Sequence, residues 1–169
     1  ENRTGGTQPG AVLPGTRMPY RESLETRRVD FGTLWQMLPA GRYVLTARAT
    51  WARQWHDHQF GENLERDRHN TAFGEITLRG TSGRHTWVGG VAIEQDTYDP
   101  TDVPRFAYRF TTPGIFIQDD IDIRPWLALS MSGRADHHSE YGWFFSPRVS
   151  ALFRSGDWST RLSAGTGFF

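Results

Sequence analysis

Histidines and carboxylates in two polar stretches are the side chains of this sequence best suited to chemistry. The first stretch contains His56, His58, Glu62, Glu65 and Asp67, and the second contains Asp136, His137, His138 and Glu140. Imidazole and carboxylate groups at these spacings are ligands for a divalent metal ion. In a long polar loop, however, such side chains are more often simply solvated. We therefore predict that neither stretch forms a metal site.

Three aspartates in the second half of the chain resemble the paired carboxylates of acid–base catalysis. Asp119, Asp120 and Asp122 lie in one alternating stretch, so only Asp120 and Asp122 share a face, and pairing with arginine is their expected role. Ser163 precedes glycines, but a nucleophile elbow needs a strand–turn–helix context that the sequence lacks. Cysteine is absent, which excludes disulfides and thiolate chemistry in this segment. We predict no enzymatic activity and no cofactor.

The elements that position these side chains alternate between apolar and polar residues, which is the pattern of β-strands. It predicts eight strands, over residues 26–37, 42–56, 71–79, 85–96, 115–123, 127–136, 143–154 and 158–164. Short turns at 39–41, 80–83, 124–126 and 155–157 alternate with longer loops at 57–69, 97–106 and 137–142. No βαβ unit or amphipathic helix appears. The predicted fold is all-β, an antiparallel up-and-down meander of about eight strands.

Composition sets further bounds on the class of protein. The 169 residues include 19 acidic and 19 basic side chains, so the net charge is zero and no nucleic-acid partner is indicated. No apolar run approaches the roughly 18 residues of a transmembrane helix. The strands of a membrane barrel alternate, however, and escape that test. Residues 1–25 are rich in Gly, Pro and Thr without periodicity, which predicts a long polar loop.

Aromatic residues gather near both ends of the predicted strands. Near the short turns we predict an interface aromatic belt of Trp35, Tyr43, Trp87, Trp126 and Trp158, with Phe153 close by. Near the longer loops lie Trp51, Trp55, Phe60, Tyr98, Tyr141 and Trp143. The apolar band between them consists of Leu45, Ala47, Ile76, Val91, Ile93, Leu129, Met131, Val149 and Leu162. Trp and Tyr suit a membrane interface, where a ring and a polar N–H or O–H are both satisfied.

The opposite face of the strands is polar. If the strands form a membrane barrel whose apolar band contacts lipid, this face lines the lumen, and the lumen-facing candidates are Arg48, Glu75, Arg79, Glu94, Arg134, Asp136, Arg148 and Arg161. Alternation alone also fits a soluble β-sandwich with an aromatic core. The two aromatic sets favour the outer-membrane barrel.

Five motifs follow one another in the last third of the chain. They are Phe116-Ile117-Gln118-Asp119-Asp120, Gly133-Arg134-Ala135-Asp136, Ser139-Glu140-Tyr141-Gly142, Ser146-Pro147-Arg148 and Leu162-Ser163-Ala164-Gly165-Thr166-Gly167-Phe168. In this order and spacing they resemble the barrel of TonB-dependent outer-membrane receptors. The hairpins over residues 71–96 are similar to earlier strands of the same barrel, more loosely.

The resemblance implies a 22-stranded barrel in the outer membrane of a Gram-negative cell. Such a barrel is plugged by an N-terminal domain and imports a scarce ligand, such as a ferric siderophore or cobalamin, with energy supplied through TonB. We expect this chain to be a fragment, in which residues 26–169 supply about eight strands while the plug domain and the TonB-contacting segment lie elsewhere. Ligand contacts would come from residues 1–25, 57–69, 97–106 and 137–142.

Two alternatives to the receptor stay open at the level of sequence. One is a small outer-membrane β-barrel of eight strands with an adhesive or structural role, because eight strands suffice for closure. The other is a soluble β-sandwich that binds carbohydrate or protein.

Overall fold

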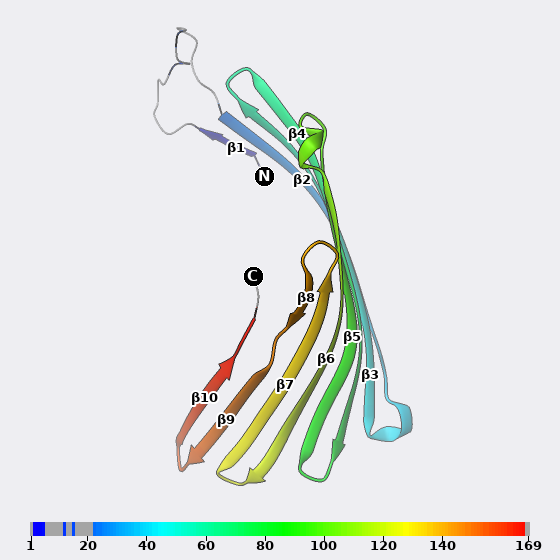
Figure 1. Cartoon of the computed structure of the whole chain (residues 1–169), viewed down its shortest axis with the longest axis vertical. Helices are drawn as coiled ribbons and strands as arrows, with labels where there is room; N and C mark the ends of the chain where they lie inside the picture. The colour runs from blue at the N-terminus through cyan, green and yellow to red at the C-terminus, as the bar shows by residue number, and fades with distance from the viewer. Residues whose placement is uncertain (1, 6–11, 13–14, 16–21, 168–169) are drawn as a thin grey trace. The chain divides into compact units, whose positions relative to one another are not determined.

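The computed structural model describes residues 2–5, 12, 15 and 22–167, most of which lie in β-strands. The strands are β1 (Asn2–Gly5), β2 (Glu22–Met37), β3 (Tyr43–Phe60), β4 (Asn63–Ser82), β5 (His85–Pro100), β6 (Tyr108–Arg124), β7 (Leu127–His138), β8 (Gly142–Phe145), β9 (Arg148–Ser155) and β10 (Trp158–Gly165) (Figure 1). Two short 3-10 helices, η1 (Pro39–Gly41) and η2 (Pro104–Phe106), interrupt the connections. No helix in these residues is long and apolar enough to cross a membrane.

All ten strands belong to one sheet. The hydrogen-bonded order follows the chain from β1 to β7 and continues to β9 and β10, while β8 pairs with β7. The predicted all-β antiparallel meander is confirmed. Its eight predicted strands correspond to β2 to β7, then β8 and β9 together, and finally β10.

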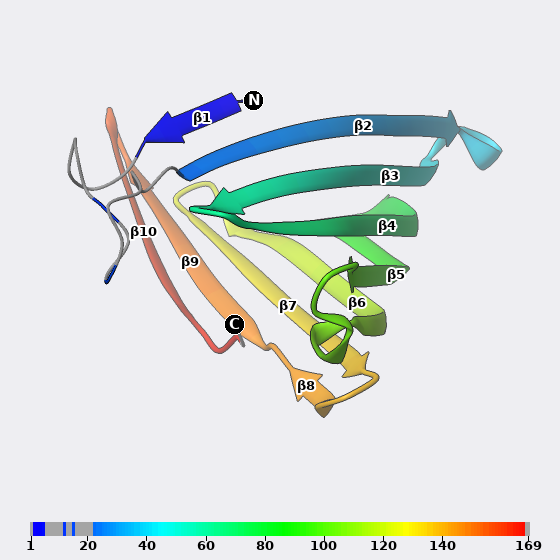
Figure 2. The same cartoon turned by 90° about the horizontal axis from the view of Figure 1, so that it is seen from above.

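The strand predicted over residues 143–154 is broken in two. Ser146 still exchanges backbone hydrogen bonds of 2.8 and 3.2 Å with Arg134 of β7. Pro147 accepts a hydrogen bond of 3.0 Å from Thr166 N, beyond the end of β10, but has no N–H to return it. Figure 2 shows the break between β8 and β9, both of which pair with β7. The prediction of one continuous strand is therefore wrong at this point.

The residue contacts divide the chain into two units, which we describe separately. Unit 1 comprises Glu1–Phe31, Thr50–Ala72 and Gln95–Phe110, and unit 2 comprises Gly32–Ala49, Phe73–Glu94 and Thr111–Phe169. Each unit thus contains parts of several strands, and unit 2 contains β7 to β10 entirely. The four short turns predicted from the sequence, at 39–41, 80–83, 124–126 and 155–157, lie in unit 2.

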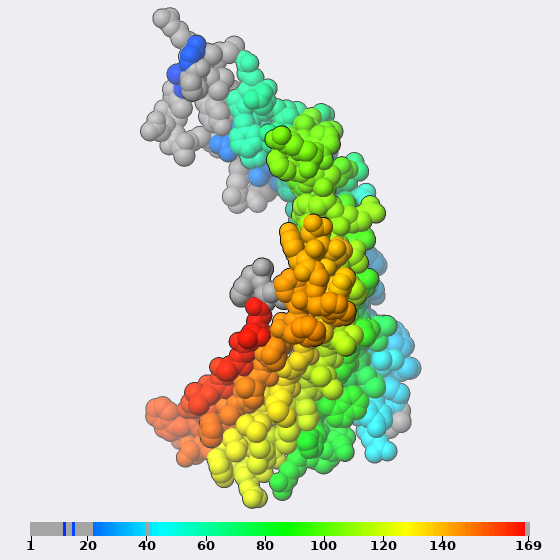
Figure 3. Space-filling model, viewed as in Figure 1, coloured from blue at the N-terminus to red at the C-terminus, as the bar shows by residue number. Residues whose placement is uncertain are grey.

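In unit 2 the strand register separates two chemically different faces. Ile117 lies opposite Gly133, and Met131 lies opposite both Asp119 and Val149. Figure 3 shows β6 to β10 side by side in this unit. The apolar face carries Leu45, Ala47, Ile76, Val91, Ile93, Ile115, Ile117, Leu129, Met131, Val149 and Leu162, and the polar face carries Arg48, Glu75, Glu94, Gln118, Ser130, Ser132, Arg134, Asp136, Arg148 and Arg161.

Strands β3 and β4 extend much further than the sequence predicted. The loop predicted over 57–69 is wrong, because β3 continues to Phe60 and β4 begins at Asn63, with a two-residue turn in which Gly61 has φ of 62°. Both faces of this hairpin are polar, so the alternation that reveals a half-buried strand is missing. The loops at 97–106 and 137–142 also shrink, to 101–107 and 139–141.

The predicted loop over residues 1–25 contains ordered backbone at both ends. Asn2–Gly5 pair with residues 22–25 in an antiparallel ladder, so β2 begins four residues before the predicted Thr26. Glycine and polar residues concealed these pairings in the sequence. Residues 6–11, 13–14 and 16–21 of that loop, and Phe168 of the last motif, lie outside the described residues.

Few side chains in the described segments are buried. Ala52, Ala92 and Asp136 are buried, and no large side chain there is fully enclosed. Most members of the apolar face, among them Ile76, Val91, Ile93 and Ile117, are exposed. A β-sandwich covers its apolar faces with a second sheet. The described residues form a single sheet, which leaves most of its apolar face uncovered.

Candidate functional site

The polar face of unit 2 carries a charged pair between β3 and β4. Arg48 Nε lies 3.0 Å from Glu75 Oε1, and the Arg48 guanidinium lies 5.2 Å from the ring centre of Phe73. Glu75 is largely shielded from solvent whereas half of Arg48 is exposed. The Phe73 ring therefore holds the Arg48 guanidinium close to the strand, while about half of the Arg48 side chain stays exposed to solvent.

A second charged pair on this face lies along β7. Arg134 Nη2 donates to Asp136 Oδ1 at 2.7 Å, and Arg134 also lies 5.7 Å from the ring centre of Phe116. Asp136 is only 2% exposed. Its carboxylate occupies the space that a side chain at Gly114, its register partner on β6, would need. Glycine at that position is what allows the buried carboxylate to lie against β6.

Six of the eight lumen-facing candidates are tied to neighbours on this face. Glu94 and Glu75 interact electrostatically with Arg134, in addition to the two pairs above. Arg148 packs over Gly165 of β10, where a side chain would collide with it. Arg161 lies opposite Leu152, and Arg79 lies in β4 with its side chain exposed. The expected pairing of Asp120 with arginine is replaced by hydrogen bonds from Gln118 at 3.0 and 3.2 Å.

In unit 1 the same face of the strands, which is polar in unit 2, carries histidine, aspartate and tyrosine side chains that form hydrogen-bond networks. The sequence did not predict these networks. His56 Nδ1 lies 2.7 Å from Asp67 Oδ1, and His69 Nε2 lies 2.5 Å from Asp96 Oδ1. Tyr98 also hydrogen-bonds Asp67. Tyr108 does the same with Asp96. The result is two Tyr-Asp-His networks, each offset from the other by one strand.

Tyr98 of β5 and Tyr108 of β6 lie in unit 1, outside the segments of these strands that carry the apolar face of unit 2. Partial burial and the neighbouring carboxylate raise the pKa of Tyr98 above the usual 10.0, with Asp67 as the main charge. Burial and Asp96 raise the pKa of Tyr108 in the same way. A phenol that donates to a carboxylate is harder to ionise. Both hydroxyls are therefore neutral donors at physiological pH.

Aromatic rings extend these networks into a surface, which we call the tyrosine face of unit 1. Tyr98 stacks on Tyr108 at 5.5 Å between ring centres, and Tyr108 stacks on Phe110 at 4.5 Å. His58 lies 3.7 Å from Phe60 and 3.5 Å from Glu22. Among the described residues no three His, Cys, Asp or Glu side chains are grouped to hold a metal ion. The face instead offers ring surfaces and hydrogen-bonding groups.

The connection between β5 and β6 folds over the edge of the tyrosine face. Asp102 accepts hydrogen bonds from the backbone and side chain of Arg66, which hold the pKa of that carboxyl below its ordinary value. Thr101 N donates to Arg66 O at 2.8 Å. A hollow of about 280 Å³ lies between this connection and the network, and its lining includes His58, Asp67, Tyr98, Arg105 and Phe106. Its size suits part of a small molecule.

Aromatic rings near the short turns cluster on the apolar face of unit 2. Tyr43 and Trp87 lie 6.1 Å apart and flank Gly80, where a side chain would collide with both rings. Trp126 stacks with Phe153 at 6.5 Å, and Trp35 and Trp158 are exposed. Of the second aromatic set, Phe60 and Tyr98 belong to the tyrosine face. Grouping them with Trp51 and Trp55 by distance along the chain was wrong, because strand alternation turns them to the other side.

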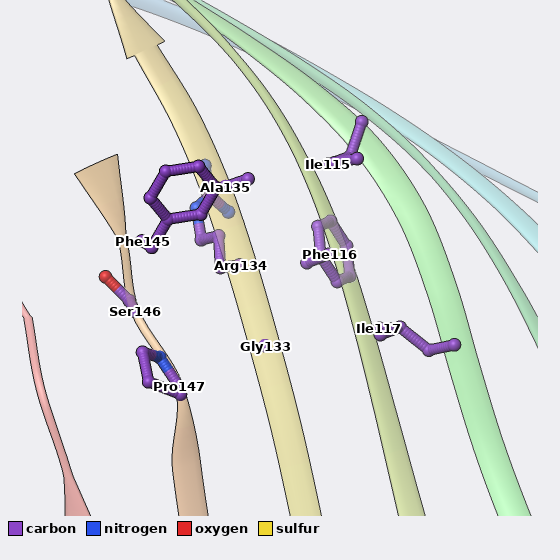
Figure 4. A pocket seen from close by; sticks show the side chains of 9 residues that line it. All are labelled: Ile115, Phe116, Ile117, Gly133, Arg134, Ala135, Phe145, Ser146 and Pro147. Carbon is purple, nitrogen blue, oxygen red and sulfur yellow. The ribbon is translucent and has the colours of Figure 1, made fainter. Parts of the chain in front are cut away.

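The apolar face of unit 2 also has a hollow of about 370 Å³ beside the break between β8 and β9. Figure 4 shows its lining, with Gly133 at the centre, Ile115 and Ile117 on one flank and Phe145 and Pro147 on the other. The apolar face is interrupted by one polar pair, His85 and Asp119, which lie 2.7 Å apart. Asp119 therefore does not contribute to the polar face.

Comparison with known proteins relates this geometry to one family. The model of the family described as TonB dependent receptor-like, beta-barrel, matches residues 2–168. The crystal structure of the siderophore receptor PirA from Pseudomonas aeruginosa is similar in fold, with a TM-score of 0.75 and 14% sequence identity. The similarity covers 86% of this chain and 28% of that receptor. No curated protein sequence matches the chain.

Proposed function

The chain belongs to the β-barrel family of TonB-dependent receptors, and from this premise we propose that it is part of the barrel wall of a receptor that imports a scarce ligand. The observation that carries the proposal is the family match over residues 2–168, together with a sheet that is apolar on one face and charged on the other. A wall of this kind separates lipid from an aqueous lumen. The likeness to PirA supports the same fold.

The apolar face of unit 2 faces lipid in this proposal, and the polar face lines the lumen. The eight lumen-facing candidates named above would then meet a plug domain or the passing ligand. Trp35, Tyr43, Trp87, Trp126 and Trp158 would form the interface belt on the side of the short turns, because their rings are exposed or clustered on the apolar face. This assignment places the short turns on the periplasmic side.

The remaining parts of the receptor are also proposals. The chain spans 28% of the length of the receptor it resembles. We infer that residues 26–169 supply about eight strands of a 22-stranded barrel in the outer membrane of a Gram-negative cell. Energy would reach the barrel through TonB and a plug domain outside these residues. The protein would then act as a transporter and not as an enzyme.

We expect the imported ligand to bind at the tyrosine face of unit 1. Stacked rings of Tyr98, Tyr108 and Phe110 offer flat surfaces to an organic ligand, while Tyr98 and Tyr108 also donate hydrogen bonds. A ferric siderophore is the ligand to test first, because the similar structure is that of a siderophore receptor. Cobalamin is the second ligand to test.

The central experiment is uptake by the producing strain. Deleting the gene should abolish uptake of at least one of ferric enterobactin, ferrichrome or cobalamin, and a strain without TonB should show the same loss. Within the complete receptor, Tyr108→Ala should weaken binding of the imported ligand by about tenfold, the size of one lost aromatic contact. Arg109→Ala, one residue away on the opposite face, is the matched control.

Two results would contradict the proposal. One is unchanged uptake of all three ligands after the deletion, and the other is recovery of the protein outside the outer-membrane fraction. Equal loss of binding with Tyr108→Ala and Arg109→Ala would show that the tyrosine face is not the binding surface. In that case the transport role would stand and only the location of the ligand would change.

A further inference from the structure

The tyrosine face of unit 1 has an excess of negative charge. Its carboxylates are those of Glu22, Glu65, Asp67, Asp96 and Asp102, and the arginines at its edge are Arg66 and Arg105. Arg28 and Asp30 of β2 offset each other in an ion pair of 2.6 Å. With the histidines neutral, five carboxylates are therefore set against two guanidinium groups.

Both arginines at this edge already have partners. Arg66 Nη2 donates to Asp102 Oδ1 at 3.1 Å, and the Arg105 guanidinium lies 4.8 Å from the ring centre of Phe106. The hollow of about 280 Å³ is lined by both arginines and Asp102, and also by Glu65 and Asp67. Once Arg66 and Asp102 offset each other, two carboxylates of this lining remain against one guanidinium. The hollow therefore keeps a negative balance.

The two tyrosines lie within reach of these carboxylates. Burial is the first cause of the raised pKa of Tyr98, and the charges of Asp67 and Glu65 raise it further. Burial and the charge of Asp96 raise the pKa of Tyr108. Carboxylates that disfavour a phenolate favour a cation at the same place, because both effects have the same electrostatic origin.

Aromatic ring faces lie beside the carboxylates. Tyr98 and Tyr108 stack with their ring centres 5.5 Å apart, and Phe110 continues the stack at 4.5 Å from Tyr108. The face of an aromatic ring attracts a cation that lies within about 6 Å of the ring centre. A positively charged group above these rings would therefore be attracted both by the π-electrons and by the neighbouring carboxylates.

The carboxylates of Asp67 and Asp96 are fixed in place and can still accept hydrogen bonds. Each one binds a tyrosine and a histidine. An ionised carboxylate has about four lone-pair sites, so two protein partners do not saturate it. The side chains of Asp67 and Asp96 are 18% and 33% exposed, which leaves these sites open to a ligand. Acceptors already held in position cost little entropy when a ligand binds.

We propose that the tyrosine face recognises an organic cation, an ammonium or alkylated ammonium group carried by the imported ligand. The inference rests on the proposed import function and names the charge of the ligand at that site. The cation lies over the rings of Tyr98 and Tyr108, with the carboxylates of Glu65, Asp67 and Asp96 around it. The same carboxylates repel an anionic chelate, so ferric enterobactin is not the imported ligand.

The test uses the complete purified receptor in a nonionic detergent, with three probes that share one ring and differ in charge. The probes are benzyltrimethylammonium, benzyl alcohol and benzoate, and broadening of their proton NMR signals measures binding. The cation should bind about tenfold more tightly than the alcohol, because a cation–π contact and neighbouring carboxylates act on it alone. Benzoate should bind more weakly than the alcohol.

A change of charge at Glu65 tests the contribution of the carboxylates. Glu65 is exposed, so Glu65→Gln leaves the fold intact and should weaken binding of the cation about threefold without affecting the alcohol. Glu65→Asp should keep the preference for the cation. Asp99→Asn, which removes the same charge beside Tyr98 but on the opposite face of β5, is the matched control and should bind all three probes as the wild type does. Heat-modifiable migration on a gel checks that each variant is folded.

Several results would overturn the proposal. Equal binding of the cation and the alcohol would show that the rings act by stacking alone, and tighter binding of benzoate would show that the arginines decide. Failure of the cation to bind, or an equal loss in Glu65→Gln and Asp99→Asn, would also exclude the site.

Uptake after deletion of the gene separates this proposal from the import role. Loss of ferric enterobactin uptake would support import and overturn the cation site. Unchanged uptake of all three ligands named above, with the charge preference intact in the purified receptor, would overturn the import role and leave the cation site standing.

Discussion

The two units differ in the side chains that their two opposite faces carry. In unit 2 one face is apolar and exposed while the other carries Arg48, Glu75, Arg134 and Asp136. In unit 1 both faces are polar, with two Tyr-Asp-His networks on one and arginines beside tryptophans on the other. Strands β2 to β6 contribute residues to both units. The two ends of one strand can therefore carry different classes of side chain on the same face.

The largest expected effect tests the apolar face of unit 2. Ile93→Arg places a guanidinium where we propose hydrocarbon, and should lower the free energy of unfolding by about 2–4 kcal/mol. Thr97→Arg lies on the same side of β5 but in unit 1, and should change it by less than about 0.5 kcal/mol. The loss of heat-modifiable migration with temperature measures both. Equal effects would remove the distinction between the units.

A smaller effect is expected on the polar face of unit 2. Gly114→Ala should displace the Asp136 carboxylate from its place against β6 and from Arg134, because the added methyl group occupies the same space. A buried acceptor without its partner costs about 1–3 kcal/mol. Gly133→Ala, which adds a methyl group to open space on the other face, is the control. Comparable melting temperatures of the two variants would show that the pair is not needed.

On the tyrosine face of unit 1 we expect about 0.5–1.5 kcal/mol from one hydrogen bond, removed by Tyr98→Phe. The pH dependence has a definite sign. Because the pKa of Tyr98 and Tyr108 is raised in the folded protein, their contribution is present below the unfolded value of 10.0 and is lost as pH rises through the folded values. Ultraviolet difference titration of phenolate, compared between the wild type and Tyr98→Phe, should show the signal that the variant loses appearing above pH 10.0. Early ionisation would contradict the network.

The smallest effect concerns the connection between β5 and β6. Asp102→Asn removes the charge that holds this segment to Arg66, and should speed amide hydrogen exchange over residues 101–107 without changing overall stability. Asp157→Asn, in a short turn of unit 2, is the matched control. Unchanged exchange in the Asp102 variant would show that η2 is fixed by packing alone.

The strands of unit 2 were predicted more accurately from the sequence than those of unit 1. In unit 2 the alternation from Leu127 to Asp136 predicted the strand, its neighbours and its faces, because one face is apolar. In unit 1 residues 57–69 were predicted as a loop, since neither face is apolar and periodicity carries no signal. The Tyr-Asp-His networks escaped prediction for a further reason. Their members lie on different strands, and only the register brings Tyr98, Asp67 and His56 together.

The two-residue turn at Gly61 and Glu62 has a consequence for how this surface can change. Because successive residues of β3 and β4 lie on opposite faces of the sheet, a single inserted residue within 63–70 would exchange the side chains of the tyrosine face with those of the opposite face. An insertion of two residues would preserve them. Lineages of this receptor should therefore gain or lose residues here in pairs, whereas a flexible loop would accept any number. Length variation in this hairpin is constrained by parity.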